Sequence, residues 1–440
     1  MKKVLVLGAG LVSRPLVRYL LDQPETEVII ASRTVSKAEA LIEGHPKGRA
    51  VAATVQEKEK LETLVRECDV AISLLPWTYH LQVAELCLQH KTHMVTTSYV
   101  SPAMRALDQP ARDQGLLFLN EIGLDPGIDH MSAMKMIHAI EKQGGKVTSF
   151  ESVCGGLPAP EANDNPFGYK FSWSPRGVLL AGRNSAHFLK NGQDMQIENK
   201  DLFRTVSIKE VEGLGKLEVY PNRDSMLYQE LYGLKDARTI FRGTFRNLGW
   251  CETLEKIVNL GFLNDGERPE MLDWTWAQLT ASLINANPHE VKAAMAKHLG
   301  IPESHGIIAR FEWLGLFSGE KVPSNPPTVL DALTHVMEHK MAYQPGERDM
   351  IVLQHEFMAE YAGGRKESIT SLLVDYGIPH GDTSMARTVS LPAAIAVKLM
   401  LQGQITLTGV QIPVMPAIYE PVLDELESMK IKFVDRVRPL

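Results

Sequence analysis

The first third of the chain alternates between short apolar runs and segments with helical spacing. The apolar runs occupy residues 3–10, 27–33, 50–55, 69–76, 93–98 and 115–123. Segments with helical spacing lie between them, at residues 12–23, 37–44, 58–68 and 79–90. A continuous apolar run is typical of a strand buried on both faces, and strand–helix alternation over short connections is typical of a parallel sheet. We therefore predict an α/β domain built on a doubly wound parallel sheet, over residues 1–122.

The middle of the chain has a different pattern. Separate helical stretches, such as residues 129–145 and 273–300, are mixed with isolated strand candidates at 147–156 and 350–357. No fixed period repeats, which argues against a repeat architecture. We predict a second, α+β domain over residues 123–388, with a helical insertion at about 250–320. The final segment, from residue 389, returns to apolar strand and helix patterns.

Composition narrows the class of protein. The 440 residues are 44% hydrophobic and 22% charged, as in ordinary globular proteins. A net charge of −7 argues against a nucleic-acid partner. The 4 cysteines are widely spaced and form no CxxC pair, so neither a disulfide framework nor a metal site is expected. These cysteines are Cys68, Cys87, Cys154 and Cys251.

The first residues need to be distinguished from a targeting segment. Lys2 and Lys3 precede an apolar run, as in a signal peptide, but the run stops at Arg14-Pro15 and no small-residue cleavage site follows. No apolar stretch approaches the roughly 20 residues that span a bilayer. We expect a cytoplasmic protein in a reducing compartment, with no membrane partner.

A glycine loop is the first sign of chemistry. Gly8 and Gly10 directly follow the first strand and open a helix, so that backbone N–H groups could approach a pyrophosphate. The third glycine of the usual GxGxxG motif is replaced by Ser13, which leaves a plain strand–helix turn as an alternative. Because the loop opens an α/β domain at residue 8, we favour a Rossmann-type dinucleotide site.

The end of the second strand indicates the type of cofactor. NAD-binding domains usually carry Asp or Glu there, to hold the ribose 2′-hydroxyl. This chain has Ser32, Arg33 and Thr34 instead, followed by Lys37. A cation and two hydroxyls suit a 2′-phosphate, so NADP(H) is favoured. The alternative is that Arg33 is only a solvated charge.

Further polar segments lie where ligands bind in doubly wound sheets, beyond the carboxyl ends of the strands. The fourth and fifth strands end near Leu74 and at Thr96-Thr97-Ser98-Tyr99, and the sixth runs into NEIGLDPGIDH at 120–130. A loop at 155–177 is dense in proline, glycine and aromatic residues, which favours a functional loop. Two short segments, 220–225 and 241–249, each carry arginine.

Several of these segments resemble the glutamate-forming saccharopine dehydrogenases, also called saccharopine reductases. The motifs are TTSYVSPAMR, NEIGLDPGIDH, CGGLPAPEANDNPFGYKFSWSPRGVLLAGRNS, YPNRDS and RGTFR, with ERDMIVLQHEF and IPVMPAIYEPVLDELE nearer the end. The resemblance runs across nearly the whole chain. It implies that residues 389–440 rejoin residues 1–122 in one discontinuous domain. It also implies the NADP-dependent interconversion of saccharopine with glutamate and 2-aminoadipate 6-semialdehyde.

The resemblance also implies roles for individual residues. The expected substrate contacts are Ser98, Tyr99, Asp125, Arg223, Thr244, Phe245 and Arg246. The expected cofactor contacts are Gly8, Gly10, Leu11, Val12, Ser32, Arg33, Thr34, Leu74, Thr96, Thr97, Leu124, Asp125 and Trp173. The expected catalytic residues are Tyr99, Asp125 and Cys154.

The chemistry of saccharopine agrees with these residue types. The molecule is a secondary amine with three carboxylates, which guanidinium groups such as those of Arg223 and Arg246 can bind as forks. Asp125 could stabilise an iminium ion and hold a substrate ammonium group. Proton transfers to the carbinolamine need an acid–base relay, for which Tyr99, Cys154 and His130 are candidates beside bound water.

The residues themselves leave structural alternatives open. Cys154 could be a buried small hydrophobe, Asp129 a helix cap, and Tyr99 a wall of the nicotinamide pocket. No single general base is assigned. Two segments depart from the family pattern, Ala53-Thr54 and residues 388–392. The first of these departures bears on cofactor affinity more than on chemistry.

Two other functions remain as alternatives. One is a related imine reductase that uses another amine, of the carboxynorspermidine type, and the other is an NADP-binding protein without turnover. A cationic polyamine would be poorly served by Arg223 and Arg246, and a protein without turnover would be expected to lack the pocket acid or these arginines. The expected partners are therefore small-molecule substrates, and a homodimer is left open.

Overall fold

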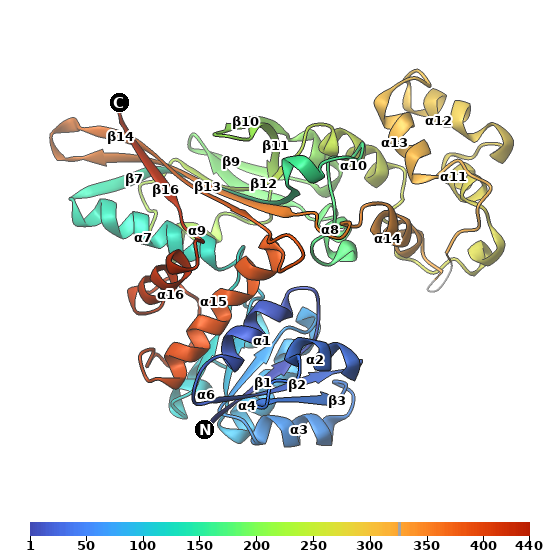
Figure 1. Ribbon diagram of the computed structural model, residues 1–440. Helices are drawn as coiled ribbons and strands as arrows, with labels where there is room; N and C mark the ends of the chain where they lie inside the picture. The colour runs from blue at the N-terminus through green and yellow to red at the C-terminus, as the bar shows by residue number, and fades with distance from the viewer. Residues whose placement is uncertain (324–326) are drawn as a thin grey trace. The chain divides into compact units, whose positions relative to one another are not determined.

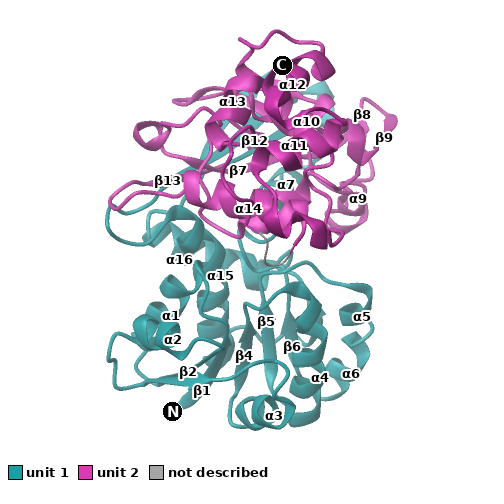
Figure 2. Ribbon diagram, turned by 90° about the vertical axis from the view of Figure 1, so that its right-hand side faces the viewer, with its two compact units in different colours: residues 1–147, 353–440 teal, residues 148–352 magenta. Residues whose placement is uncertain are grey.

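The computed structural model describes residues 1–323 and 327–440, which divide into two compact units (Figure 2). Unit 1 comprises Met1–Val147 and Leu353–Leu440, and unit 2 comprises Thr148–Val352. The domain limits predicted at 122/123 and 388/389 stay a prediction.

Unit 1 is built on a parallel sheet of seven strands in the order β15-β6-β5-β4-β1-β2-β3, of which Figure 1 labels β1, β2 and β3. The strands are β1 (Lys2–Leu7), β2 (Thr26–Ser32), β3 (Gly48–Ala52), β4 (Val70–Ser73), β5 (His93–Thr96), β6 (Leu117–Leu119) and β15 (Gly409–Gln411). Every neighbouring pair is parallel. The strand order reverses between β1 and β4, which is the switch point where doubly wound sheets bind ligands. The predicted α/β fold is confirmed.

The α-helices of unit 1 include the six that connect strands β1 to β6. The unit 1 helices are α1 (Ser13–Leu21), α2 (Val35–Ile42), α3 (Lys58–Arg66), α4 (His80–His90), α5 (Pro102–Arg105), α6 (Asp108–Asp113), α7 (Ile128–Lys142), α15 (Ser384–Leu401) and α16 (Pro416–Ser428). The central strand β1 is apolar and buried after its first two residues, and Val4, Leu5 and Val6 have no exposed surface. Leu64 of α3 and Val83 of α4 belong to the same core cluster as Leu5. Burial on both faces explains why the strands appear in the sequence as continuous apolar runs.

A second, mixed sheet has nine strands, with β10-β11-β12-β7-β13-β14-β16 in order, β8 paired with β12, and β9 paired with β8. The strands are β7 (Gly145–Pro158), β8 (Ala186–Lys190), β9 (Gln193–Ile197), β10 (Ser207–Val211), β11 (Gly215–Pro221), β12 (Thr239–Arg246), β13 (Asp349–Tyr361), β14 (Lys366–Tyr376) and β16 (Val434–Pro439). Strand β12 is parallel to β7 and antiparallel to β11. This arrangement places Cys154, Tyr220 and Thr244 in register across three adjacent strands.

The α-helices of unit 2 lie mostly in its second half. They are α8 (Pro175–Ala181), α9 (Leu227–Leu231), α10 (Trp250–Asn259), α11 (Trp276–Ile284), α12 (Val291–Leu299), α13 (Gly306–Leu314) and α14 (Val329–Lys340). The single helical stretch predicted at 273–300 is wrong, because α11 and α12 are separate helices. Asn285 ends α11 in the left-handed conformation, with φ of 54°, and Pro288 follows. Neither feature is compatible with a continuing helix.

The expectation that no apolar stretch approaches the length of a bilayer span is wrong, because helix α15 is 18 residues long and apolar enough to cross a membrane by length and composition alone. However, 72% of it is buried inside the protein, a property of ordinary core helices. It also contains Pro392, which has no N–H to donate to the carbonyl group of Thr388. The departure from the family pattern at 388–392 therefore lies in a buried helix.

Candidate functional site

The glycine loop lies between β1 and α1. Gly8 has φ of +113°, and a Cβ atom there would lie 3.1 Å from the backbone oxygen of Leu74. Ser13 stands where the motif usually has its third glycine, and it is fully buried. Its Oγ accepts a hydrogen bond from the N–H of Gly10 at 3.0 Å and donates one to the carbonyl of Gly8 at 3.3 Å. Ser13 thus closes the turn with its side chain, while the space beside Gly10 stays open.

The end of β2 presents an uncompensated positive charge. Arg33 and Thr34 are exposed, and the N–H of Thr34 donates to Ser32 Oγ at 3.3 Å. Among residues 1–323 and 327–440, no hydrogen bond or ion pair engages the Arg33 guanidinium group. The first turn of α2 contains no acidic residue. A group with several negative oxygens, such as a 2′-phosphate, fits this charge.

A hydroxyl–imidazole network joins the ends of β4 and β5. His80, the first residue of α4, lies 2.8 Å from Ser73 Oγ through Nδ1 and 2.8 Å from Ser98 Oγ through Nε2. Its Nε2 also lies 3.3 Å from Thr96 Oγ1. Burial lowers the pKa of His80 to about 4, so the ring is neutral near pH 7. His80 was not among the predicted site residues, although its position after a strand end was a usable signal.

The loop 120–130 brings Tyr99 and Asp125 together. The Tyr99 hydroxyl donates a hydrogen bond to Asp125 Oδ1 at 3.2 Å, and both residues are half-buried. Gly127 has φ of +147°, and a Cβ atom there would lie 2.1 Å from the carbonyl oxygen of Gly123. Only glycine fits at that position. The turn therefore has a steric requirement of its own, and Asp125 lies within it.

The other two polar residues of this loop belong to its scaffold. Asp129 Oδ1 accepts from the N–H of Gly127 at 2.6 Å and from the N–H of His130 at 2.8 Å, as a carboxylate near a helix start does. His130 is fully buried and its Nε2 lies 2.8 Å from Glu121 Oε2. The other oxygen of Glu121 accepts from the N–H of Val100 at 2.9 Å. Asp129 is therefore not the N-cap residue of α7, which is Gly127, but its carboxylate accepts from N–H groups at the helix start, and His130 lies against Glu121.

Unit 2 contains a buried arginine inside an aromatic cage. Arg246, at the end of β12, is only 5% exposed. Its guanidinium carbon lies 4.9 Å from the ring centre of Tyr169, 5.4 Å from that of Trp250 and 5.9 Å from that of Tyr220. Burial raises the pKa of both tyrosines, which remain neutral phenols. The cage therefore surrounds the cation with aromatic faces.

The hydrogen-bonding capacity of this cage is only partly used. Arg246 Nη1 donates to the carbonyl oxygen of Phe245 at 2.8 Å. Arg246 Nε, the Tyr169 hydroxyl and Trp250 Nε1 are buried without a hydrogen-bond partner. An unpaired buried cation is costly, and native proteins rarely leave such groups unsatisfied. A bound anion would satisfy them.

The nearest acid in the strand register does not neutralise Arg246. Glu218 of β11 lies directly opposite Arg246. Its two carboxylate oxygens accept instead from the N–H groups of Gly249 at 2.7 Å and Cys251 at 2.8 Å, at the start of α10. Within the described part of the chain, no ion pair engages Arg246. The cation is therefore available to a ligand carboxylate.

The remaining predicted residues of unit 2 lie on or near the same strands. Thr244 is half-buried on β12, Phe245 is fully buried, and Cys154 is buried on β7 and not in a disulfide. Arg223 is exposed in the turn after β11, with φ of 57°, and Trp173 is half-buried before α8. Roles that combine these residues with those of unit 1 stay predictions.

Arg242 was not among the predicted site residues either. Strand residues two apart face the same side, so the FRGTFR motif places Arg242, Thr244 and Arg246 on one face of β12. The guanidinium group of Arg242 lies 4.5 Å from the Tyr228 ring centre, and its Nη1 donates to the Tyr228 hydroxyl at 2.6 Å. The side chains of Tyr169, Tyr220 and Trp250 were missed as well, because aromatic residues on separate elements have no shared spacing.

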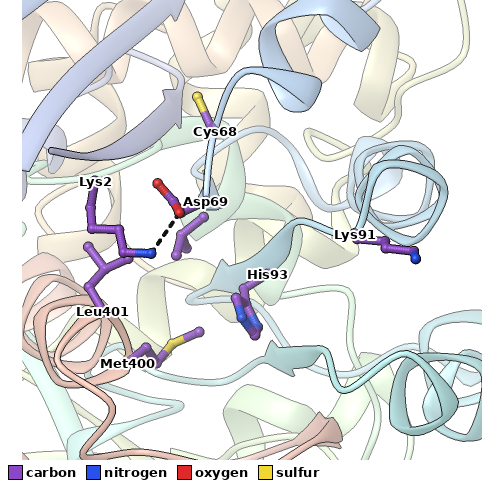
Figure 3. Close-up of a pocket in the computed structure, with 8 residues that line it drawn as sticks. Lys2, Cys68, Asp69, Lys91, His93, Met400 and Leu401 are labelled. Atoms are coloured by element: carbon purple, nitrogen blue, oxygen red, sulfur yellow. Dashed lines mark hydrogen bonds and ion pairs between the residues drawn. The ribbon is translucent and has the colours of Figure 1, made fainter.

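Figure 3 shows a different hollow of unit 1, of about 220 Å³. Its lining includes Lys2, Asp69 and His93, which lie at or next to the amino ends of β1, β4 and β5. Lys2 Nζ contacts Asp69 Oδ1 at 3.0 Å. Because the glycine loop lies at the carboxyl end of β1, this hollow is not the nucleotide site. Among the described residues, no cluster of three or more His, Cys, Asp or Glu side chains could hold a metal ion.

Known proteins resemble this chain along its whole length. Residues 4–119 match the family model of the saccharopine dehydrogenase NADP binding domain, and residues 123–431 match that of the saccharopine dehydrogenase C-terminal domain. The chain is 42% identical to the saccharopine dehydrogenase [NADP(+), L-glutamate-forming] of Schizosaccharomyces pombe, covering 99% of both proteins. It is 40% identical to the Saccharomyces cerevisiae enzyme of the same name, covering 97% of both.

Two further comparisons extend this result. The chain is 38% identical to the mitochondrial alpha-aminoadipic semialdehyde synthase of Bos taurus, covering 98% of this chain and 47% of that protein. The solved structure of apo histidine-tagged saccharopine dehydrogenase (L-Glu forming) from Saccharomyces cerevisiae superposes with a TM-score of 0.90, at 39% identity over 100% of both chains. From its dinucleotide loop to its buried arginine cage, the chain belongs to the saccharopine dehydrogenase family.

Proposed function

We propose that this chain catalyses the NADP-dependent interconversion of saccharopine with glutamate and 2-aminoadipate 6-semialdehyde, in lysine metabolism. The observation that carries the proposal is the Arg246 cage, which is buried, cationic and supplied with hydrogen-bond donors that have no acceptor among the described residues. Saccharopine and glutamate are both rich in carboxylates. The relatives described above, which bear the name of this activity, match the chain over nearly its full length.

The cofactor would be held by the carboxyl edge of the parallel sheet. The loop from Gly8 to Val12 would take the pyrophosphate on backbone N–H groups, with Leu11 exposed beside it. Ser32, Arg33 and Thr34 would bind the 2′-phosphate. The remaining contacts proposed for NADP(H) are Leu74, Thr96, Thr97, Leu124, Asp125 and Trp173. When bound, NADP(H) supplies the hydride.

Arginine side chains would hold the substrate carboxylates. Arg246 would form a charge-assisted pair with a substrate carboxylate inside the aromatic cage. Such pairs are strong in a buried setting. Arg223 would supply a second cation from its exposed turn, and Thr244 and the backbone of Phe245 would assist. Because these groups are donors, they favour an anionic amine substrate such as glutamate over a cationic polyamine.

Asp125 and Tyr99 would act on the amine itself. A carboxylate at Asp125 stabilises positive charge on the C=N nitrogen, and the iminium form is the better hydride acceptor. The Tyr99 hydroxyl, which already donates to Asp125, can pass a proton between that carboxylate and bound water. Cys154 stays a proposed participant through its position opposite Thr244.

An amine screen tests the proposal. The purified chain is supplied with aminoadipate semialdehyde and glutamate, putrescine or diaminopropane, and the oxidation of NADPH and NADH is followed. We expect turnover with glutamate and NADPH. Activity with a diamine but not with glutamate would instead identify a polyamine-type reductase. NADPH binding without turnover of any amine would identify a non-catalytic binding protein.

Cellular setting and assembly are part of the proposal too. All four cysteines are buried and outside disulfides, which supports a reducing compartment such as the cytoplasm. Fluorescence microscopy of the tagged chain tests this location. A homodimer also remains a proposal, and sedimentation equilibrium decides between one and two copies.

A further inference from the structure

We infer that His80 is a positioning residue that fixes the hydroxyl group of Ser98 as a hydrogen-bond donor toward an anionic group of the substrate. Three hydroxyl groups surround the imidazole ring, one from the end of β4 and two from the end of β5. They belong to Ser73, at the end of β4, Thr96, at the end of β5, and Ser98, which follows β5. The inference rests on the proposed function in one respect, that Ser98 faces substrate.

The hydrogen bond of Thr96 decides which ring nitrogen carries the proton. A threonine hydroxyl has one proton. Thr96 Oγ1 donates that proton to the carbonyl oxygen of Ser73 at 2.9 Å. Toward His80 Nε2, at 3.3 Å, Thr96 can therefore only accept. It follows that Nε2 carries the hydrogen of the ring.

The other side of the ring is then determined as well. A neutral imidazole has one N–H group, and burial keeps the His80 ring neutral because its pKa is lowered to about 4. With the hydrogen on Nε2, Nδ1 is an acceptor. The Ser73 hydroxyl must then donate to Nδ1 across their 2.8 Å contact. The hydrogen bonds all run in one direction, from Ser73 through the ring to Ser98.

This direction leaves the proton of Ser98 free for a ligand. Ser98 Oγ accepts from His80 Nε2 at 2.8 Å. Within residues 1–323 and 327–440, no group accepts the proton of Ser98. Donors that accept from another donor are polarised and bind anions more strongly. In the opposite tautomer, with the hydrogen on Nδ1, the Ser98 hydroxyl would donate its proton to Nε2. It would then present only lone pairs to the ligand, and these repel a carboxylate.

A spectroscopic experiment on the unmodified protein tests the tautomer. Two-bond nitrogen–proton correlation spectra of the protein labelled with ¹⁵N-histidine distinguish Nε2–H from Nδ1–H rings. We expect one Nε2–H pattern that is absent from the spectrum of His80→Gln. An Nδ1–H pattern for that ring would overturn the inference, whatever the protein catalyses.

A double-mutant cycle tests the consequence for substrate. His80→Leu removes the donor to Ser98, and we expect kcat/KM for saccharopine to fall about ten-fold, with the Kd of NADP⁺ unchanged. His80→Gln, which keeps an N–H group near the Nε2 position, should recover part of this loss. In a Ser98→Ala background, His80→Leu should lower kcat/KM little further, because the hydroxyl group that His80 positions has already been removed.

His93→Gln is the matched control. His93 lies at the amino end of β5, whereas His80 contacts residues at the carboxyl ends of β4 and β5. His93 also accepts a side-chain hydrogen bond, through Nδ1 from the N–H of Leu117 at 3.0 Å. Because it lies at the end of the strand away from the proposed site, its replacement should leave kcat/KM unchanged. Equal losses from His80→Leu with and without Ser98 would show a merely structural role and overturn the inference. Failure of the proposed function would look different, because the unmodified protein would not oxidise saccharopine.

Discussion

Two polar regions of this molecule differ in how their hydrogen-bonding groups are satisfied. In unit 1, the groups around the strand ends are paired with one another, as in the His80 network and the Glu121–His130 pair. In unit 2, Arg246 and two of the aromatic side chains around it are buried with unused donors. Apart from the Ser98 proton, the first region is complete without a ligand and acts as a scaffold. The second is incomplete, and a substrate carboxylate would complete it.

The largest expected effect comes from the incomplete region. Arg246→Met should lower kcat/KM for saccharopine by about 10³-fold, because a desolvated pair with a carboxylate is lost. The melting temperature should not fall, since an unpaired buried cation is replaced by an apolar side chain of similar length. Steady-state kinetics and calorimetry check both. A fall in stability would show that Arg246 is part of the scaffold, and loss of NADPH binding would reject its assignment to substrate.

The complete region should respond through stability instead. Gly127→Ala places a Cβ atom 2.1 Å from the carbonyl of Gly123, so the loop must shift. We expect the free energy of unfolding to fall by roughly 3 kcal/mol, as for other strained backbone positions. Gly115→Ala is the control, because Gly115 has φ of +69° but no atom within 4 Å of the added carbon. Urea unfolding should show that the free energy of unfolding of the control falls by only about 1 kcal/mol.

The buried histidine makes the stability of unit 1 depend on pH. The pKa of His80 is lowered from 6.5 to about 4 by burial, so the unfolded chain binds more protons between these values. Stability therefore falls as the pH falls through this window. The His80 contribution should be roughly 2 kcal/mol between pH 7 and pH 5, and His80→Gln should remove it. Urea unfolding of both proteins at the two pH values measures the difference, and equal pH slopes would contradict a buried neutral ring.

The smallest effect concerns the exposed cation of the cofactor site. Arg33→Ala should raise the KM for NADPH about ten-fold and leave that for NADH nearly unchanged, because only NADPH carries the 2′-phosphate. Arg49→Ala is the matched control, since Arg49 is an exposed arginine of β3 that pairs with Glu67 at 2.7 Å. Equal changes in the KM values for NADPH and NADH would show that Arg33 does not bind the 2′-phosphate.

Much of this protein could be predicted from residue order because the signals were local. The alternation of buried strands and helices up to residue 122 predicted the parallel sheet, and the glycine loop with Arg33 predicted NADP. The long motifs around Asp125 and Arg246 indicated the family. Strands β11 and β12 were not predicted although most of their residues are buried. Strands β8 to β10 were not predicted either, because short antiparallel strands with exposed faces have little apolar periodicity. Strand β16 was missed for the same reason, since all of its residues are exposed.

The sequence alone therefore determined the fold class, the cofactor and the family, since each depends on residues that are adjacent or regularly spaced. Only the tertiary structure decided what the polar residues do. It assigned Asp129 to a helix start, placed His130 against Glu121, and brought His80 to Ser98. It also left Arg246 without an acid although Glu218 lies opposite. Such outcomes depend on which distant groups share one buried space, and residue order does not specify that.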